Sequence, residues 1–584
     1  MGLVVLAATI PLVVLALDPN GWFPFGPSKW LVISTVLPSG TAIACWARPP
    51  RITRRAGIAV VAFLGWVSLA AAIGDDRWYA WLGTPERRMG VATWMLCAVG
   101  FAGGHCFDSR DRRVALSWGV SIAALGLGLA ASAEAFGYEP SVFAITSGRL
   151  TATMGSAAFL GAATTVLLPA AAAIAADSRN ARSLRRVAAA AVVPVAIACL
   201  GSGARAAWVG LVAAAAVLAV IRRADVRAAG RRAIVAAGLA AVAIVAIAVW
   251  SPVGGRVASA TDPDSAGGRS RVDEWRVAVH VITRHPLTGV GPEGYRIAFA
   301  EGVDDHYEQA YGRDPLPDRA HSAPLDVALA GGLPLLGLWC AVVGLMLVAA
   351  VAALRSADVS LIGFGGGLIA YFAGELLLFP TAELEPIAWM LGGMLLAAAT
   401  SPPARVTAAR GVARAGSAVL AVLAFGALLA GARDIAADRD ARDAADALAS
   451  GSTHTAVAAA RAATDLRPDE VRLRLLLAQS LEADQQGTGI ALAAVDDALH
   501  VSPLDPTAMR LQAELLIDRA SATHLPNDIA RARAATARLV ARDPHNAKFW
   551  LLDARAARLG GDATRAEASD SEAQRLAGAR FGQL

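Results

Sequence analysis

The chain has little charge for its length. Only 17% of its 584 residues are Asp, Glu, Lys or Arg, whereas 56% are hydrophobic, and the mean hydropathy is +0.49. Soluble domains carry about 25% charged residues, so a soluble globular protein is excluded. The apolar residues come in blocks near bilayer length, which predicts a polytopic membrane protein. The net charge of +5 comes from short clusters spread along the chain, so no nucleic-acid partner is expected.

Motifs for metals, cofactors and nucleophiles are also scarce. The five cysteines lie in apolar segments without paired spacing, which gives neither a disulfide framework nor a zinc site. No two of the histidines and aspartates between His280 and His321 have a tight ligand spacing such as HExxH. The run Gly289–Gly294 matches G-x-G-x-x-G, yet no hydrophobic strand precedes it, so it does not predict a dinucleotide site. We therefore expect no metal and no cofactor.

The apolar blocks predict about thirteen membrane-spanning helices. They fall at 2–17, 29–46, 57–73, 91–107, 114–131, 153–176, 187–200, 207–221, 233–250, 324–353, 360–379, 386–400 and 415–431. Four units follow: an N-terminal bundle (1–250), a long polar loop (251–323), further spans (324–431) and a C-terminal region (432–584). The predicted fold class is all-α.

Arginines set the expected orientation. They are concentrated at 48–55, 110–113, 179–186, 222–232, 355 and 405–414, which the positive-inside rule places in the cytoplasm. The alternate loops, the long polar loop and the C-terminal region are then outside. Abundant Ala, Arg and Gly suggest a GC-rich genome, so we expect a bacterial cytoplasmic (inner) membrane.

Some arginines lie on the predicted outer side, where the topology rule disfavours them. They are Arg87, Arg88, Arg149 and Arg205, together with Arg269, Arg271 and Arg276 of the long loop. Contact with lipid headgroups would explain any one of them. Their number instead favours an anion site, because guanidinium groups bind phosphate oxygens in a bidentate manner.

The long loop also contains acid–base candidates. Residues 273–284 are predicted to form an amphipathic helix on the outer membrane face, with Trp275 at the interface. His321 stands just before the 324–353 span and could take a proton from a hydroxyl, with Asp326 to orient it. A helix-terminal polar residue without a role is the alternative for His321. Glu375, inside a predicted span, is either functional or the structural partner of an arginine.

The C-terminal region repeats one theme. Small residues line one helix face and a Pro-Asp or Asp-Pro stop follows, around Pro468, Pro503 and Pro544. This spacing is typical of tetratricopeptide (TPR) helical hairpins, which bind partner proteins. A helical cap without a partner is the alternative.

Five segments together resemble the O-antigen ligase and Wzy-type polymerase superfamily. They are R-x-x-x-W-x-x-A with HPLTGVGPEGY (271–295), RAHSAPLDVALAGGLPLLGL (319–338), WLGTPERRMG (81–90), GRLTATMGSAAFLGAATTVLLP (148–169) and GSGARAAWVGL (201–211). The family usually has Asn where this chain has Ser322, and an Asn-Pro-Asn-like segment where this chain has Met154-Gly-Ser-Ala-Ala.

The resemblance implies a metal-independent membrane glycosyltransferase of the GT-C type. Its donor would be a glycan on a polyprenyl-pyrophosphate carrier, and its acceptor a glycan, lipid, protein or wall polymer. By the family pattern, Arg205, Arg271 or Arg269, and Arg87 or Arg88 would hold the pyrophosphate, and His321 would activate the acceptor hydroxyl. Ligase and polymerase both fit. A transporter or a membrane scaffold that recruits partners through the tail are the alternatives of another class.

Overall fold

The computed structural model describes residues 1–138, 148–224, 270–400, 405–407 and 409–583. Within these ranges the chain is helical except for one two-stranded antiparallel pair, β1 (Arg51–Thr53) with β2 (Arg405–Thr407). Eight helices are long and apolar enough to cross a membrane, and four shorter apolar helices accompany them. The predicted all-α polytopic fold is confirmed. Each predicted span outside 233–250 coincides with one of these helices, and 233–250 lies outside the described residues.

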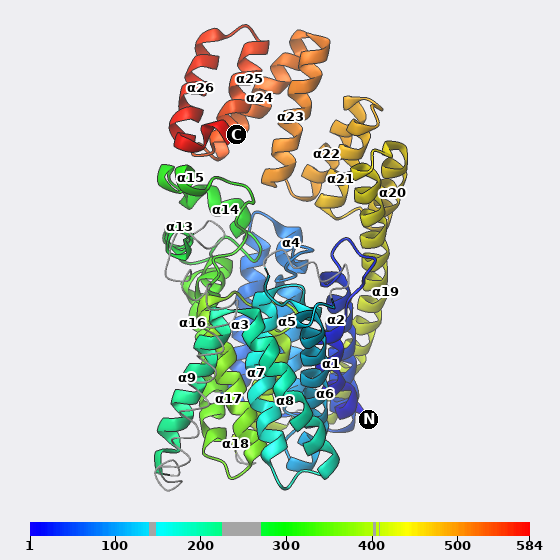
Figure 1. The fold of residues 1–584 in the computed structure, drawn as a ribbon, viewed down its shortest axis with the longest axis vertical. Helices are drawn as coiled ribbons and strands as arrows, with labels where there is room; N and C mark the ends of the chain where they lie inside the picture. Colours follow the sequence, from blue (N-terminus) through cyan, green and yellow to red (C-terminus); the bar gives the residue numbers. More distant parts are fainter. Residues whose placement is uncertain (139–147, 225–269, 401–404, 408, 584) are drawn as a thin grey trace.

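The apolar helices form one bundle (Figure 1). They are α1 (Gly2–Leu15), α2 (Gly26–Ala47), α3 (Arg54–Ile73), α5 (Val91–Gly104), α6 (Arg110–Ala135), α7 (Ala157–Ala176), α8 (Arg182–Ser202), α9 (Arg205–Ile221), α16 (Ala323–Leu354), α17 (Val359–Gly374), α18 (Glu385–Ala399) and α19 (Arg410–Ala449).

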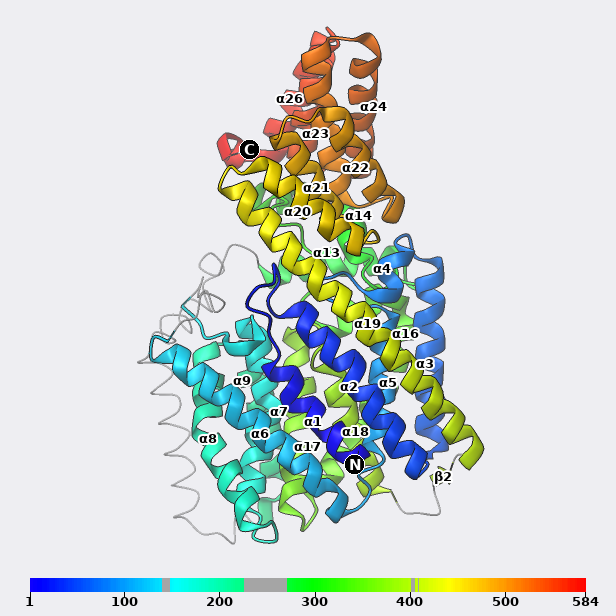
Figure 2. The same cartoon turned by 90° about the vertical axis from the view of Figure 1, so that its right-hand side faces the viewer.

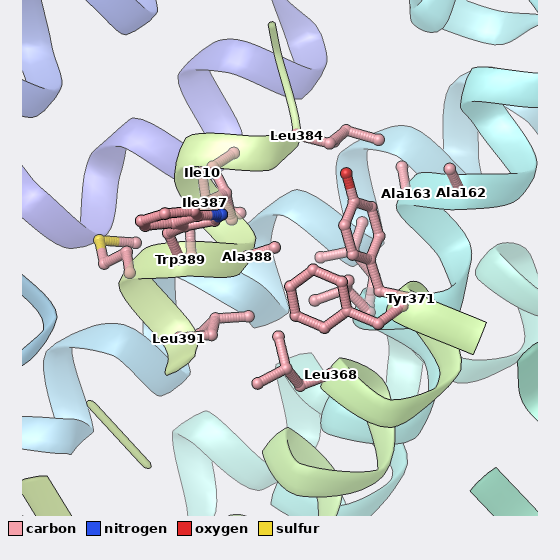
Figure 3. Close-up of a cluster of buried hydrophobic side chains, with 14 of the residues drawn as sticks. Ile10, Ala162, Ala163, Leu368, Tyr371, Leu384, Ile387, Ala388, Trp389 and Leu391 are labelled. Atoms are coloured by element: carbon pink, nitrogen blue, oxygen red, sulfur yellow. The ribbon is translucent and has the colours of Figure 1, made fainter. Parts of the chain in front are cut away.

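Helix α18 is in the centre of the bundle. Its 15 residues reach only about 22 Å at 1.5 Å per residue, less than the roughly 30 Å of a hydrocarbon core. Trp389 on α18 is fully buried, with its ring centroid 5.7 Å from that of Phe63 and 6.3 Å from that of Trp94. Figure 3 shows the apolar side chains that surround this helix. Neighbouring helices rather than lipid therefore surround α18.

The predicted continuous span at 324–353 is broken. Helix α16 loses helical geometry at Gly331 and Gly332, and Gly332 has a φ of +72°. The turn after α13 (Arg271–Arg284) fills the break, because Val290 N–H donates to the Leu329 carbonyl (2.7 Å) and Leu333 N–H donates to the Pro286 carbonyl (2.8 Å). The span itself is present, but hydropathy does not reveal the break, because two glycines inside an apolar run do not change its hydropathy, whereas they allow another segment to bond to the open backbone.

The glycine-rich run of this turn has a packing function. A Cβ added to Gly289 would come within 2.3 Å of the Leu329 carbonyl oxygen, and one added to Gly332 within 2.4 Å of Leu287 backbone atoms. Only glycine permits this close approach of the two backbones. The turn therefore packs the segment after α13 closely against α16.

The described parts of the two predicted sets of loops lie at opposite ends of the bundle (Figure 1). At the end near the N-terminus, Asp177 and Asp358 pair with Arg110 and Arg179 from the arginine-rich loops. At the other end lie α4 (Arg77–Leu82), the long-loop helices α13, α14 (Tyr295–Gly302) and α15 (Asp305–Tyr311), and the C-terminal helices. The structure thus separates the loops as expected from the arginine pattern.

Helix α19 connects the bundle to the C-terminal region without a linker. It runs along α2 and continues past the predicted boundary at residue 432 (Figure 2). The C-terminal helices are α20 (Thr453–Leu466), α21 (Val471–Ala483), α22 (Thr488–Val501), α23 (Pro506–Thr523), α24 (Pro526–Arg542), α25 (Ala547–Leu559) and α26 (Ala563–Ala577). Pro468, Pro503 and Pro544 each lie in the turn inside a helical hairpin. The hairpins are present, and their assignment as TPR units stays a prediction.

Candidate active site

Three cationic or basic side chains contact one aromatic ring at the end of the bundle nearest the long-loop helices. Phe379 lies in the connection between α17 and α18, after the short η3 turn (Glu375–Leu377). The His321 ring meets it edge to face at 5.2 Å between centroids, and the guanidinium carbons of Arg87 and Arg319 lie 4.8 and 5.9 Å from its centroid. We call His321, Arg87, Arg319 and Phe379 the His321 cluster.

The backbone at His321 is held in an unusual conformation. His321 has a φ of +53°, in the left-handed region, where a side chain costs on the order of 1–3 kcal/mol. Two hydrogen bonds hold the turn: Ala320 N–H donates to Asp326 Oδ1 (3.2 Å), and Asp326 N–H donates to the Ser322 carbonyl (2.9 Å). Asp326 therefore fixes the backbone beside His321, whereas the sequence predicted a contact with the imidazole ring.

Burial, together with nearby positive charge, keeps His321 neutral. Burial and the nearby charges of Arg271, Arg87 and Arg319 lower the pKa of His321 to about 3, although Asp318 acts in the opposite direction. A neutral imidazole has a free nitrogen lone pair at physiological pH. The side chain can thus accept a proton, as a general base must.

Arg87 reaches the cluster through a bidentate ion pair with Asp318. Its Nε lies 2.5 Å from Asp318 Oδ2, and its terminal nitrogen lies 3.2 Å from Oδ1. Burial alone would raise the pKa of Asp318, but the charges of Arg87 and Arg319 bring that pKa below its ordinary value. The carboxylate is therefore ionised and balances Arg87.

Arg88, the next residue, points away from the cluster. Its guanidinium is buried in an ion pair with Asp434 of α19 and lies over the Trp30 ring at 5.8 Å. Arg467 binds the second oxygen of the same Asp434. Of the two arginines between which the sequence left the choice open, the geometry favours Arg87 for the anion site.

Glu293 connects three parts of the site. One carboxylate oxygen accepts from Met89 N–H (2.8 Å), and the other lies 2.7 Å from an Arg319 nitrogen and 3.3 Å from the Thr84 hydroxyl. Sequence reasoning missed Glu293, Arg319, Asp318 and Phe379. A usable signal was the position of Arg319, which stands two residues before His321.

The structure gives the other predicted arginines different partners. Arg271 begins α13, pairs with Glu274 (2.5 Å) and is half exposed, and its charge acts on His321. Arg276 pairs with Asp273 (2.8 Å) on the exposed side of α13. Arg149 donates to the Ser202 carbonyl (2.7 Å) and so joins the 148–150 loop to the segment before α9. Arg269 lies outside the described residues.

Arg205 is the first residue of α9, and its side chain is exposed. This end of α9 packs on the end of α17, where a Cβ on Gly374 would lie 2.9 Å from the Ala206 carbonyl oxygen. Arg205 therefore lies close to the η3 turn that precedes Phe379. Within the described ranges it forms no ion pair, so its guanidinium has free donors.

The predicted helix on the membrane surface has its main apolar face turned inward. In α13, Val277, Ala278 and Val281 are buried and pack with α14 and α16. Val272 and Val279 remain 59% and 47% exposed. A membrane contact through these two side chains stays a prediction.

Glu375 is buried beside a second carboxyl group. It lies next to Glu385 and Tyr371, and Glu385 accepts hydrogen bonds from the Tyr371 hydroxyl (3.0 Å) and Trp389 Nε1 (2.9 Å). Among the described residues Glu375 has no arginine partner. The same residues contain no group of three His, Cys, Asp or Glu side chains that could bind a metal, and metal independence stays a prediction.

Substitutions of Asp326 distinguish a structural from a chemical role. Asp326→Asn keeps an oxygen that accepts from Ala320 N–H, so we expect near-normal turnover. Asp326→Ala removes the acceptor, which costs about 1–3 kcal/mol and should lower turnover by one to two orders of magnitude. If the Asn variant is as inactive as the Ala variant, the ionised carboxylate itself is needed.

These features define the class: an all-α polytopic membrane protein with a neutral histidine among arginines at one end of the bundle. Residues 189–340 match the family model described as O-antigen ligase. This match confirms, for residues 189–340, the sequence resemblance to the O-antigen ligase and Wzy-type superfamily. No curated protein matches the chain. The matched range includes Arg205, Arg271, His321 and Asp326 but neither Arg87 nor the C-terminal helices.

Proposed function

We propose that the protein transfers a glycan from a polyprenyl-pyrophosphate carrier to an acceptor hydroxyl at the outer face of a bacterial cytoplasmic membrane. The observation that carries the proposal is the neutral His321 next to Arg87 and Arg319, with the charge of Arg271 close by. A base and several guanidinium groups are the two elements that such a transfer requires.

In the proposed reaction, His321 takes the proton of the acceptor hydroxyl. The oxygen attacks the anomeric carbon of the donor glycan, and the bond from that carbon to the phosphate oxygen breaks. The polyprenyl pyrophosphate leaves with the bonding electrons. Arg87, Arg205 and Arg271 would stabilise its added negative charge. This stabilisation is strongest when the hydrogen-bond donors are already in place before the reaction.

The outer location rests on the arginine-rich loops. They gather at the end opposite the His321 cluster, and the positive-inside rule assigns that end to the cytoplasm. The donor would then be presented from the outer leaflet.

A transporter would also have broken helices. In α16, however, backbone groups of the 286–290 turn bond to the groups that flank the break, so the chain itself satisfies them. The break is therefore better explained as an attachment point of the outer loop. This favours an enzyme over a transporter.

The test is a transfer assay with full-length protein in lipid nanodiscs. The donor is a short glycan on polyprenyl pyrophosphate, with and without candidate lipid, protein or wall-polymer acceptors, and mass spectrometry identifies the products. A donor–acceptor adduct indicates a ligase, and growth of the lipid-linked glycan indicates a polymerase. Absence of any transfer, in protein that remains folded, would overturn the proposal.

A further inference from the structure

The Gly291–Gly294 turn places one carboxylate, that of Glu293, against Arg319 of the His321 cluster. Glu293 has a φ of +62°, a conformation that favours glycine, and it is 6% exposed. A side chain at this position costs stability. Its carboxylate, however, contacts both the Thr84–Met89 turn, which carries Arg87, and Arg319, which stands beside His321.

Arg319 is buried but not saturated with partners. It is 8% exposed, its only ion pair is with Glu293, and its Nε–H has no hydrogen-bond acceptor in the part of the chain that the structure describes. A guanidinium group has five N–H donors in a planar fork, and Glu293 shares its oxygens with Met89 and Thr84. Donors of Arg319 thus remain for a further acceptor, next to His321 and over Phe379.

A buried guanidinium with unused donors favours an anionic ligand, because burial without a partner costs free energy. The geometry points to Arg319 as an additional ligand of the donor's pyrophosphate, held in place by Glu293 as a positioning residue. This inference rests on the proposed function. It adds a specificity element: Arg87 and Arg319 approach from two different loops that Glu293 joins, so together they suit two linked phosphates better than one.

Binding measurements on the full-length protein in nanodiscs test the inference separately from catalysis. The probes are polyprenyl pyrophosphate without glycan, polyprenyl monophosphate and polyprenol. Arg319→Gln should weaken pyrophosphate binding at least about tenfold and reduce the preference over the monophosphate, since charge-assisted bidentate contacts are lost. Arg319→Lys keeps the positive charge but lacks the planar guanidinium group, so its affinity for polyprenyl pyrophosphate should lie between those of the wild type and Arg319→Gln. The exposed Arg284 of α13 is the matched control, and Arg284→Gln should bind like the wild type.

The positioning role of Glu293 has its own readout. Glu293→Gln should weaken binding less than Arg319→Gln does. The double variant Glu293→Gln/Arg319→Gln should be no weaker than Arg319→Gln alone, because Glu293 acts through Arg319. Independent, additive losses would overturn the positioning role. If Arg319→Gln is unstable because it leaves Glu293 buried and unpaired, the double variant and Arg319→Lys carry the test.

The outcomes separate the two proposals. Suppose that the wild-type protein transfers glycan and prefers the pyrophosphate lipid. If Arg319→Gln then binds polyprenyl pyrophosphate as tightly as the wild type, only this inference is overturned. A wild-type protein that does not prefer polyprenyl pyrophosphate over polyprenol overturns both the inference and the proposed donor.

Discussion

His321→Ala should lower glycan transfer by roughly 10²- to 10⁴-fold, the usual contribution of a positioned general base. The imidazole is the only titratable group in the His321 cluster that is neutral and able to accept a proton. Arg205→Ala should cause a comparable loss of transfer, because the leaving pyrophosphate loses a stabilising positive charge. The readout is turnover with a lipid-linked donor, together with membrane abundance and thermal stability.

The control for this prediction is His306→Ala, which changes an exposed histidine on α15 in the same long polar loop. It should leave turnover unchanged. Full activity of both His321→Ala and Arg205→Ala would contradict the mechanism.

The pH dependence follows from the same cluster. A general base works in its neutral form, and with a pKa of about 3 His321 is neutral in the free enzyme well below pH 6.5. The kcat/KM for the donor, which reports the free enzyme, should therefore lack the acid limb near about pH 6.5 that an ordinary histidine gives. The negative charge of bound pyrophosphate favours the protonated imidazole, so the acid limb of kcat should lie at higher pH than that of kcat/KM.

A donor kcat/KM that halves near pH 6.5 would show that burial and the three arginines do not lower the pKa of His321 as expected. Comparison with Arg87→Gln separates the contributions, since removal of one positive charge should move the acid limb of kcat/KM upward.

The second large effect is expected at Arg313, where the C-terminal domain holds the segment that leads to His321. Arg313 is 6% exposed and forms a bidentate pair with Asp543 (3.1 and 3.2 Å) and a third contact with Glu308 (2.6 Å). Removal of one partner of a buried ion pair typically costs about 3–5 kcal/mol. Asp543→Ala should therefore lower the thermal unfolding midpoint and turnover together.

An exposed pair in the same domain is the control. Arg533 and Asp562 lie 2.7 Å apart with exposed side chains, and such pairs contribute about 0–1 kcal/mol. Arg533→Ala should change neither quantity. Hydrogen exchange of residues 312–322 gives a direct measure, and unchanged protection in Asp543→Ala would contradict the positioning of this segment by the C-terminal domain.

These contacts also change the expected role of the C-terminal region. The sequence suggests that the acidic segment 298–318 is a mobile flap on the acceptor side, whereas in the structure this segment contacts the C-terminal helices. His545 binds Asp305, and Gln309 donates to the Arg575 carbonyl. Deletion of 434–584 would remove Asp434 and Asp543, the ion-pair partners of Arg88 and Arg313, so single substitutions separate an enzyme from a scaffold better than truncation. A separate protein partner for this domain stays a prediction.

Much of the fold follows from hydropathy alone. The predicted spans match the apolar helices because burying an uninterrupted apolar block depends only on local composition. The break at Gly331 was missed, since its cause is a distant segment that bonds to it. The Pro positions of the C-terminal hairpins were found because the helix stop is local.

The candidate site divides in the same way. The arginine pattern and the resemblance identified His321, Arg205 and Arg87 or Arg88, because a cation on the unexpected side of a membrane is visible in the sequence. Only the structure separates Arg87 from Arg88, as consecutive side chains in a turn point toward different partners.

By itself, the sequence determined that this is a polytopic helical membrane protein with its polar chemistry in one long loop. Tertiary structure decided which side chains meet. Glu293 and Phe379 join the His321 cluster from two separate turns, whereas Asp318 and Arg319 directly precede His321 in the chain. The contacts of Glu293 and Phe379 depend on the packing of segments far apart in sequence. Each membrane span, in contrast, is determined by the hydrophobicity of its own residues.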